Sequence, residues 1–101
     1  MSNYVFVDII ECRKMYERKD SAWICVRMQD GYSTGQVDIP TEDSGVNIYD
    51  NLGILEWCKD FGSDDSVEMA DLIDYIIEEE CSVTINGTEY SWDEIKHLFG
   101  E

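Results

Sequence analysis

The sequence predicts an α+β domain in which a small antiparallel sheet packs with about three helices. Runs of β-branched and aromatic residues near the N-terminus predict three strands, and an Asn-Gly pair near the C-terminus predicts a hairpin. Helical periodicity dominates the chain between them, and a capped helix closes it. The length of 101 residues and the hydrophobic fraction of 44% suit a single acidic domain, residues 1–101, with its own core.

The N-terminal part of the predicted sheet consists of three antiparallel strands. We expect them at residues 4–10, 23–28 and 36–39. The first is rich in Val, Ile, Tyr and Phe, which favours a largely buried strand. Gly31 supplies a turn between the second and the third strand, and Pro40 ends the third because it has no backbone N–H to donate.

Residues 47–61 are predicted to form the first helix, because their apolar side chains cover one broad face. Gly53 lowers the helix propensity by about 1 kcal/mol relative to Ala. Gly62 is a natural residue to end this helix. A second helix follows almost at once, so the two should pack against each other with their apolar faces inward.

Residues 60–80 are predicted to form this second helix, and they hold nine carboxylates and no Lys, Arg or His. Apolar side chains fall on one side of the helix and carboxylates on the other, with Tyr75 among the carboxylates. Asp65 followed by Glu68 predicts a capping pair at the start. The acids of the last turn lie at the negative end of the helix dipole, where cations are preferred, so we interpret this side as a binding surface for a basic partner. The candidate partner-binding residues are Asp64, Asp65, Glu68, Asp71, Asp74, Tyr75, Glu78 and Glu79.

The C-terminal part of the chain predicts a hairpin and a closing helix. Residues 83–85 and 88–90 flank an Asn-Gly pair, the strongest short hairpin signal. Ser91 and Glu94 predict a capping box for the final helix, which Gly100 ends.

The charge is large and unevenly distributed, with a net value of −16. Residues 1–40 hold six acids and five bases, whereas residues 41–101 hold seventeen acids and two bases. Such a field repels nucleic acid and anionic membranes and attracts basic protein surfaces. We therefore expect a basic protein as partner, with no direct binding to nucleic acid or membrane.

No motif for enzyme chemistry is present in the sequence, so we expect a protein that is not an enzyme and needs no cofactor. The single histidine, His97, falls on the polar side of the last helix without a nucleophile beside it. The acids from Asp60 to Asp71 are of the type that calcium prefers, but they lack the order and the glycine of a calcium-binding loop, so we expect no metal site. Four cysteines without a C-x-x-C pair, and the absence of a signal-peptide pattern, predict reduced thiols in the cytoplasm.

Size and charge, rather than any motif, favour a non-enzymatic acidic inhibitor that binds a basic, nucleic-acid-binding protein as a nucleic-acid mimic. In composition alone, the chain is like small phage proteins that disarm restriction or CRISPR nucleases. A phage-encoded protein of this kind would act in the host cell cytoplasm. Carboxylates of neighbouring segments would raise the charge density of the acidic helix: Asp50, Glu56, Asp64, Asp65, Glu79, Glu89, Asp93 and Glu94.

Two alternatives fit the same composition. An immunity protein or antitoxin that covers a basic nuclease toxin would concentrate its binding energy around one aromatic residue, for which Tyr75 is the candidate. A self-associating interaction protein would instead pair the basic residues of the stretch 13–19 with the acidic C-terminal half of a second copy, as a homodimer.

Overall fold

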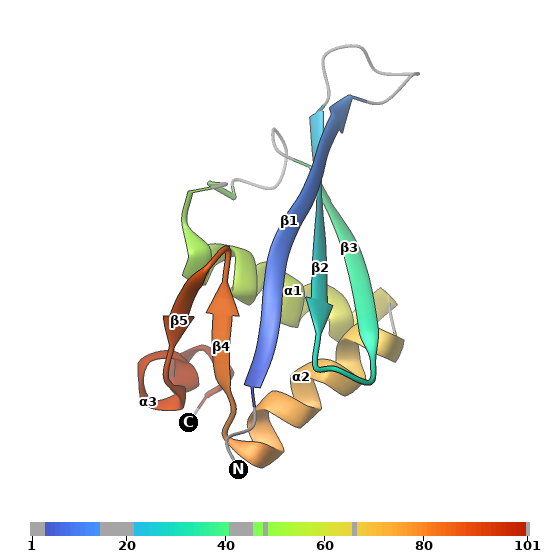
Figure 1. Ribbon diagram of the computed structural model, residues 1–101. Helices are drawn as coiled ribbons and strands as arrows, with labels where there is room; N and C mark the ends of the chain where they lie inside the picture. Colours follow the sequence, from blue (N-terminus) through green and yellow to red (C-terminus); the bar gives the residue numbers. More distant parts are fainter. Residues whose placement is uncertain (1–3, 15–21, 41–45, 48, 66, 101) are drawn as a thin grey trace.

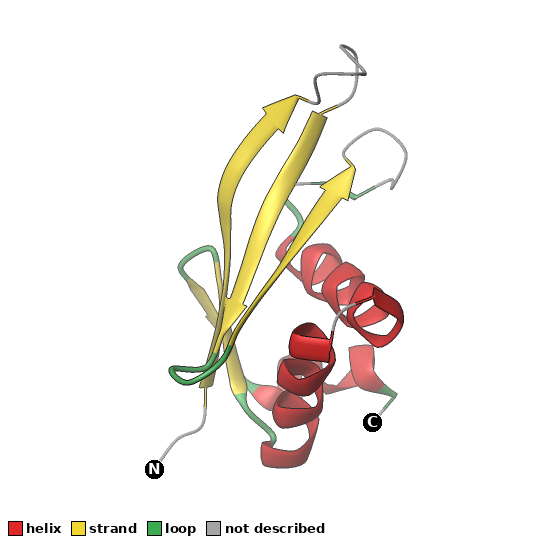
Figure 2. Ribbon diagram, turned by 90° about the vertical axis from the view of Figure 1, so that its right-hand side faces the viewer, coloured by secondary structure: helices red, strands yellow, loops and turns green. Residues whose placement is uncertain are grey.

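The computed structural model describes residues 4–14, 22–40, 46–47, 49–65 and 67–100, and the side chains of these residues except 11–14, 22–23 and 61–65. One five-stranded sheet forms the fold, and the helices lie on one face of it (Figures 1 and 2). The elements in chain order are β1 (Tyr4–Lys14), β2 (Ala22–Gln29), β3 (Thr34–Pro40), α1 (Asn51–Asp65), α2 (Val67–Glu79), β4 (Ser82–Ile85), β5 (Thr88–Tyr90), α3 (Trp92–Ile95) and the 3-10 helix η1 (Lys96–Phe99). The α+β class predicted from the sequence is therefore confirmed. None of the described helices is long and apolar enough to cross a lipid bilayer.

The strand order is β3-β2-β1-β4-β5, and the sheet is mixed rather than wholly antiparallel. β1 pairs with β2 in antiparallel fashion, as do β2 with β3 and β4 with β5. At the centre, however, β4 runs parallel to β1, with Val5 opposite Val83. β4 can run parallel to β1 because a long crossover leads to it. A parallel neighbour needs such a crossover, and the two helices between β3 and β4 provide it. Sequence patterns locate strands but do not reveal this pairing.

The core lies between the sheet and the helices. Along β1 and β2, buried residues alternate with more exposed ones, which places every second side chain against the helices. The core residues that are less than 2% exposed and largest in volume are Ile24, Met28, Ile39, Ile54, Leu55, Met69, Leu72, Ile76, Ile85, Ile95, Val5 and Val7. Trp57 and Trp92 are partly buried and pack against this core.

Asp50 determines where α1 begins. Its backbone oxygen accepts a hydrogen bond from the Ile54 nitrogen (3.0 Å), and its Oδ1 accepts one from the Gly53 nitrogen (3.1 Å). A Cβ atom on Gly53 would lie 2.8 Å from Oδ2 of Asp50. The glycine, which lowers helix propensity, thus makes room for the capping carboxylate. The helix begins four residues later than the predicted residue 47.

The junction between the two helices differs from the prediction. α1 continues through Gly62 and ends at Asp65, and α2 begins at Val67. Gly62 is therefore not the residue that ends α1, and Asp65 belongs to the last turn of α1 rather than to a cap of α2. Glycine in a helix costs only about 1 kcal/mol, which packing of the rest of the helix can offset. Residue 66, between the helices, lies outside the described residues.

The Asn-Gly hairpin is confirmed, and its asparagine also joins the hairpin to β1. Asn86 and Gly87 have φ values of 49° and 86°, the positive values that a tight hairpin turn of type I′ requires. The Asn86 nitrogen donates to the Val7 oxygen (2.9 Å), and the Ile9 nitrogen donates to Oδ1 of Asn86 (2.9 Å). Asn51 of α1 donates from Nδ2 to the Ile85 oxygen (3.2 Å). The turn therefore fixes β1, β4 and α1 to one another.

The closing helix is shorter than the sequence suggests. α3 has four residues and passes directly into η1. The side chain of Ser91 does not cap the helix backbone; its Oγ lies 3.2 Å from Oε1 of Glu94, so the predicted capping box is not formed. Gly100 ends η1 with a φ of 80°. Nζ of Lys59 donates to the Leu98 oxygen (2.7 Å), and this bond ties α1 to the C-terminal segment.

Candidate protein-binding surface

The candidate site is the solvent-facing side of α2. The side of α2 that faces the sheet is formed by the buried residues Met69, Leu72, Ile73 and Ile76. Asp71, Asp74 and Glu78 project from the opposite side and are exposed. Among the described residues, no hydrogen bond or ion pair involves any of these three carboxylates. The structure thus places three carboxylates that have no ion-pair partner among the described residues along one side of α2. We call them the acidic row (Asp71, Asp74 and Glu78).

Glu68 and Glu79 extend this surface on one flank of the helix. Both are exposed, and each also interacts with other groups of the chain. The negative charge of Glu79 acts on Tyr75 and Cys81 and contributes to the raised pKa values of both. These two glutamates are therefore part of the surface, but unlike the acidic row they also interact with other residues of the chain.

Asp64 and Asp65 do not lie where the sequence places them. Both belong to the last turn of α1, and the helix changes direction before α2 begins. Their side chains lie outside the described part of the chain. Sequence reasoning treated residues 60–80 as one helix, and the break near residue 66 removes these two acids from the face of α2.

Tyr75 lies on the flank of α2 rather than standing free among the carboxylates. It is half-buried and packs against the core. Desolvation raises the pKa of its hydroxyl, and the charges of Cys81, Asp30 and Glu79 act in the same direction. Asp30 belongs to the turn between β2 and β3, so the tyrosine ring lies near the end of that hairpin. Much of this side chain therefore serves to hold α2 against the sheet.

Further carboxylates lie on the same helical layer. Glu56 and Asp60 are exposed on α1, which packs beside α2 on the same side of the sheet (Figure 2). Asp60 lies 3.4 Å from Nζ of Lys59. Asp50 is used as the cap of α1, as described above. Two other acids that the sequence predicts to add to the charge of this helix lie away from it. Glu89 is on the far face of the sheet, and Asp93 is on α3, 3.3 Å from Lys96.

The basic stretch at residues 13–19 cannot be assigned a surface. Residues 15–21 lie outside the described residues, and Arg13 and Lys14 are described only as the backbone end of β1. Elsewhere in the described chain, Lys59 and Lys96 have carboxylate partners. Arg27 has no carboxylate partner among the described residues, and no local sequence pattern indicates this.

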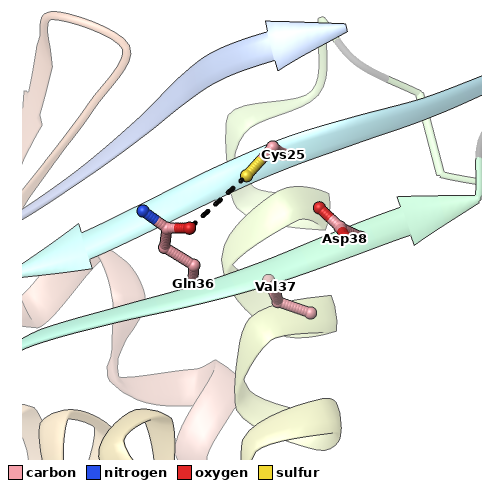
Figure 3. Close-up of a pocket in the computed structure, with 4 residues that line it drawn as sticks. All are labelled: Cys25, Gln36, Val37 and Asp38. Carbon is pink, nitrogen blue, oxygen red and sulfur yellow. Dashed lines mark hydrogen bonds between the residues drawn. The ribbon is translucent and has the colours of Figure 1, made fainter. Parts of the chain in front are cut away.

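A small hollow between β2 and β3 is lined by Cys25, Gln36, Val37 and Asp38 (Figure 3). Sγ of Cys25 lies 3.9 Å from Oε1 of Gln36. The hollow holds about 100 Å³, well below the roughly 300–1,000 Å³ of typical ligand pockets. Within the described residues, no three His, Cys, Asp or Glu side chains come close enough together to hold a metal ion. The candidate site is therefore the set of exposed carboxylates on α1 and α2, which we call the acidic helical layer (Glu56, Asp60, Glu68, Asp71, Asp74, Glu78 and Glu79).

Burial makes two of the described thiols, those of Cys58 and Cys81, harder to ionise. Cys25, Cys58 and Cys81 are buried thiols that are not in disulfide bonds. Burial raises the pKa of Cys58 to about 12 and that of Cys81 to about 11, so both are protonated at neutral pH.

Comparison with known proteins gives no family model, no curated protein and no solved structure that matches this chain.

Proposed function

We propose that the protein is a non-enzymatic inhibitor whose acidic helical layer occupies the nucleic-acid-binding surface of a basic protein. The observation that carries this proposal is the acidic row on α2. Its carboxylates are exposed and have no ion-pair partner among the described residues. Like charges at this spacing repel by a few tenths of a kcal/mol per pair, so the row works against folding of the isolated chain. A basic partner converts that repulsion into attraction.

The linear charge density of α2 is close to that of one nucleic-acid strand. Five carboxylates, at positions 68, 71, 74, 78 and 79, lie along the helix. With a rise of 1.5 Å per residue, their average spacing is about 4 Å along the axis. One strand of duplex DNA carries a charge about every 3.4 Å. On the neighbouring helix α1, Glu56 adds a further exposed carboxylate, and Asp60 adds one that is paired with Lys59.

The position of Tyr75 supports a distributed mimic over an immunity protein with a single aromatic anchor. Hot-spot residues usually insert exposed aromatic area into a pocket of the partner. Tyr75 already uses part of its ring against the core. Its remaining surface flanks the carboxylates, so binding energy is expected to come mainly from charge. The proposed site of action is the cytoplasm, where thiols are kept reduced.

The test is capture of the partner with matched bait proteins. The wild-type chain, immobilised, is expected to retain a basic nucleic-acid-binding protein that elutes with rising salt and is identified by mass spectrometry. The acidic-row variant carries Asp71→Asn, Asp74→Asn and Glu78→Gln. We expect it to bind at least tenfold more weakly, about 1.4 kcal/mol, and to have an unchanged or higher melting temperature.

A control variant removes the same number of charges elsewhere. It carries Asp38→Asn, Glu89→Gln and Asp93→Asn, which are on the sheet and on α3. We expect it to bind the captured partner nearly as well as the wild type. Equal losses in the two variants would mean that only net charge matters. Normal binding by the acidic-row variant, together with a lower melting temperature, would mean that these carboxylates are structural and that α2 is not the site.

A further inference from the structure

The face of the sheet opposite the helices carries an exposed aromatic pair. Figure 2 shows the described helices on one side of the sheet and none on the other. On the uncovered face, Tyr4 is 47% and Phe6 is 37% exposed, and their ring centroids lie 5.1 Å apart at an interplanar angle of 74°. Ile10, at the bulge of the same strand, is 39% exposed. These residues belong to β1, the central strand, so the apolar surface lies in the middle of the sheet rather than at its edge.

Arg27 lies on the same face, and no carboxylate of the described residues forms an ion pair with it. It alternates along β2 with Val26 and Met28, whose side chains are buried in the core. Its Nε is buried and has no hydrogen-bond partner. The sheet register places Asp8 directly opposite Arg27, yet within the described residues no ion pair joins them. One cation and one carboxylate thus stand side by side on the uncovered face, each available to a group from outside the chain.

We propose that a second copy of the chain covers this face, with the two sheets packed face to face about a two-fold axis. The Tyr4 and Phe6 rings of both copies would then form the apolar centre of the interface. Arg27 of each copy would pair with Asp8 of the other, and the two pairs would be related by the axis. The buried Nε of Arg27 would thereby gain an acceptor.

The distribution of charge favours a second copy at this face over one at the helical side of the sheet. Two chains with a net charge of −16 repel each other most strongly where their acidic helical layers approach. Face-to-face packing of the sheets places those layers on opposite outer sides of the dimer, as far apart as the fold allows. Among the described residues, the uncovered face holds one cation, Arg27, and three carboxylates, Asp8, Asp38 and Glu89, which is less negative charge than α1 and α2 carry on the other side of the sheet.

The size of the face fits a small dimer interface. The five strands hold 11, 8, 7, 4 and 3 residues. With a rise of about 3.3 Å per residue and a strand spacing of about 4.8 Å, the sheet has a flat area of roughly 500 Å². Side chains enlarge the accessible surface beyond this flat area. A dimer that covered the whole face would therefore bury an area close to the lower end of specific interfaces, about 600 Å² per partner.

This proposal is independent of the proposed inhibitor function, and its salt dependence has the opposite sign. A sheet-face dimer is driven by apolar burial and is opposed by the net charge of both copies, so added salt tightens it. Pairing between basic and acidic segments of two copies would weaken with salt instead. The experiment is analytical ultracentrifugation of the full chain from about 1 to 200 μM, at about 0.1 M salt, where the Debye length is about 10 Å, and at about 1 M, where it is about 3 Å.

We expect a monomer–dimer equilibrium that shifts towards the dimer at the higher salt concentration. Phe6→Ser should raise the dimer dissociation constant at least tenfold. Tyr32→Ser is the matched control, because Tyr32 is an aromatic residue that is 100% exposed on the β2–β3 turn, and it should leave the constant unchanged. Circular dichroism melting of each variant confirms that it is folded.

A charge-reversal pair tests the predicted contact directly. Asp8→Arg and Arg27→Asp should each remain monomeric, because each places like charges across the axis. Mixing the two variants should restore a dimer that contains one copy of each, since both cross-axis contacts are then between opposite charges. A monomer at every concentration at both salt levels would overturn the proposal. So would a dimer that dissociates with added salt, one that is insensitive to Phe6→Ser, or a mixture that stays monomeric.

Discussion

A Cβ atom added to Gly35 would lie 2.7 Å from Sδ of Met69 and 3.3 Å from its backbone nitrogen. Contacts under 3.0 Å require something to shift, and the Met69 side chain is itself enclosed in the core. Gly35 of β3 therefore sets how closely the acidic helix α2 approaches the sheet. The third strand predicted from the sequence begins only at residue 36, so Gly35 lies outside it, whereas β3 of the structure begins at Thr34.

The Gly35–Met69 contact predicts that Gly35→Ala destabilises the fold by about 1–3 kcal/mol, the usual range for an overpacked core. Urea denaturation followed by circular dichroism measures the change. The neighbouring exposed Thr34 provides the control, and Thr34→Ala should change stability by less than about 1 kcal/mol. Equal stability of Gly35→Ala and the wild type would show that α2 moves away from β3 freely.

Glu80 holds a backbone conformation that favours glycine. Its φ is 49°, and the Cys81 nitrogen donates to the Ile76 oxygen (3.1 Å), which closes the end of α2. Glu80→Gly should raise the free energy of unfolding by about 0.5–1 kcal/mol, because glycine adopts positive φ without steric cost. Glu80→Ala removes the same charge but keeps the Cβ atom, so it should gain only a few tenths of a kcal/mol. Thermal melting of the two variants separates backbone strain from charge, and an equal gain in both would assign the effect to charge alone.

Cys58 predicts a loss of stability in alkali. Burial raises the pKa of its thiol from 9.0 to about 12, so the folded chain holds the proton more tightly than the unfolded chain. The contribution of the protonated thiol to the stability of the fold is therefore complete below pH 9 and is lost as the pH rises towards 12. Raising the pH from about 8 to about 10.5 should therefore lower the free energy of unfolding by roughly 2 kcal/mol through this thiol alone. Urea denaturation of the wild type and of Cys58→Ala at both pH values measures it, and the same loss in both proteins would contradict the assignment.

Substitutions of Tyr75 should separate its effect on core packing from its effect on partner binding. Because its ring packs against the core, Tyr75→Ala should lower the free energy of unfolding by about 1–3 kcal/mol, whereas Tyr75→Phe should lower it by less than about 1 kcal/mol. Both variants should bind the captured partner within about threefold of the wild type when they are folded. A large loss of binding in folded Tyr75→Ala would instead support an immunity-like interface centred on this residue.

Local patterns predicted those parts of the fold that depend on local chemistry. The Asn-Gly hairpin formed as expected, because only residues that tolerate positive φ suit a type I′ turn. The solvent side of α2 also followed from helical periodicity, so Asp71, Asp74 and Glu78 are exposed as a row. Both predictions need only the order of residues within one short segment.

Features that depend on distant segments were not predictable from pattern alone. The parallel pairing of β4 with β1 arises from the crossover through the two helices, which no short window of sequence encodes. The extension of α1 past Gly62 moved Asp64 and Asp65 off the acidic helix. Arg27 lies in a predicted strand, but only the pairing register places it opposite Asp8, and no ion pair joins the two within the described residues.

The most direct test of the central claim is displacement of DNA from the captured partner. Fluorescence anisotropy follows a labelled duplex bound to that partner while the protein is added. We expect the wild-type chain to displace the duplex competitively, and we expect the variant with Asp71→Asn, Asp74→Asn and Glu78→Gln to require at least tenfold more protein. Simultaneous binding of duplex and protein, or equal displacement by the wild type and the variant, would contradict the claim that the acidic row of α2 takes the place of nucleic acid.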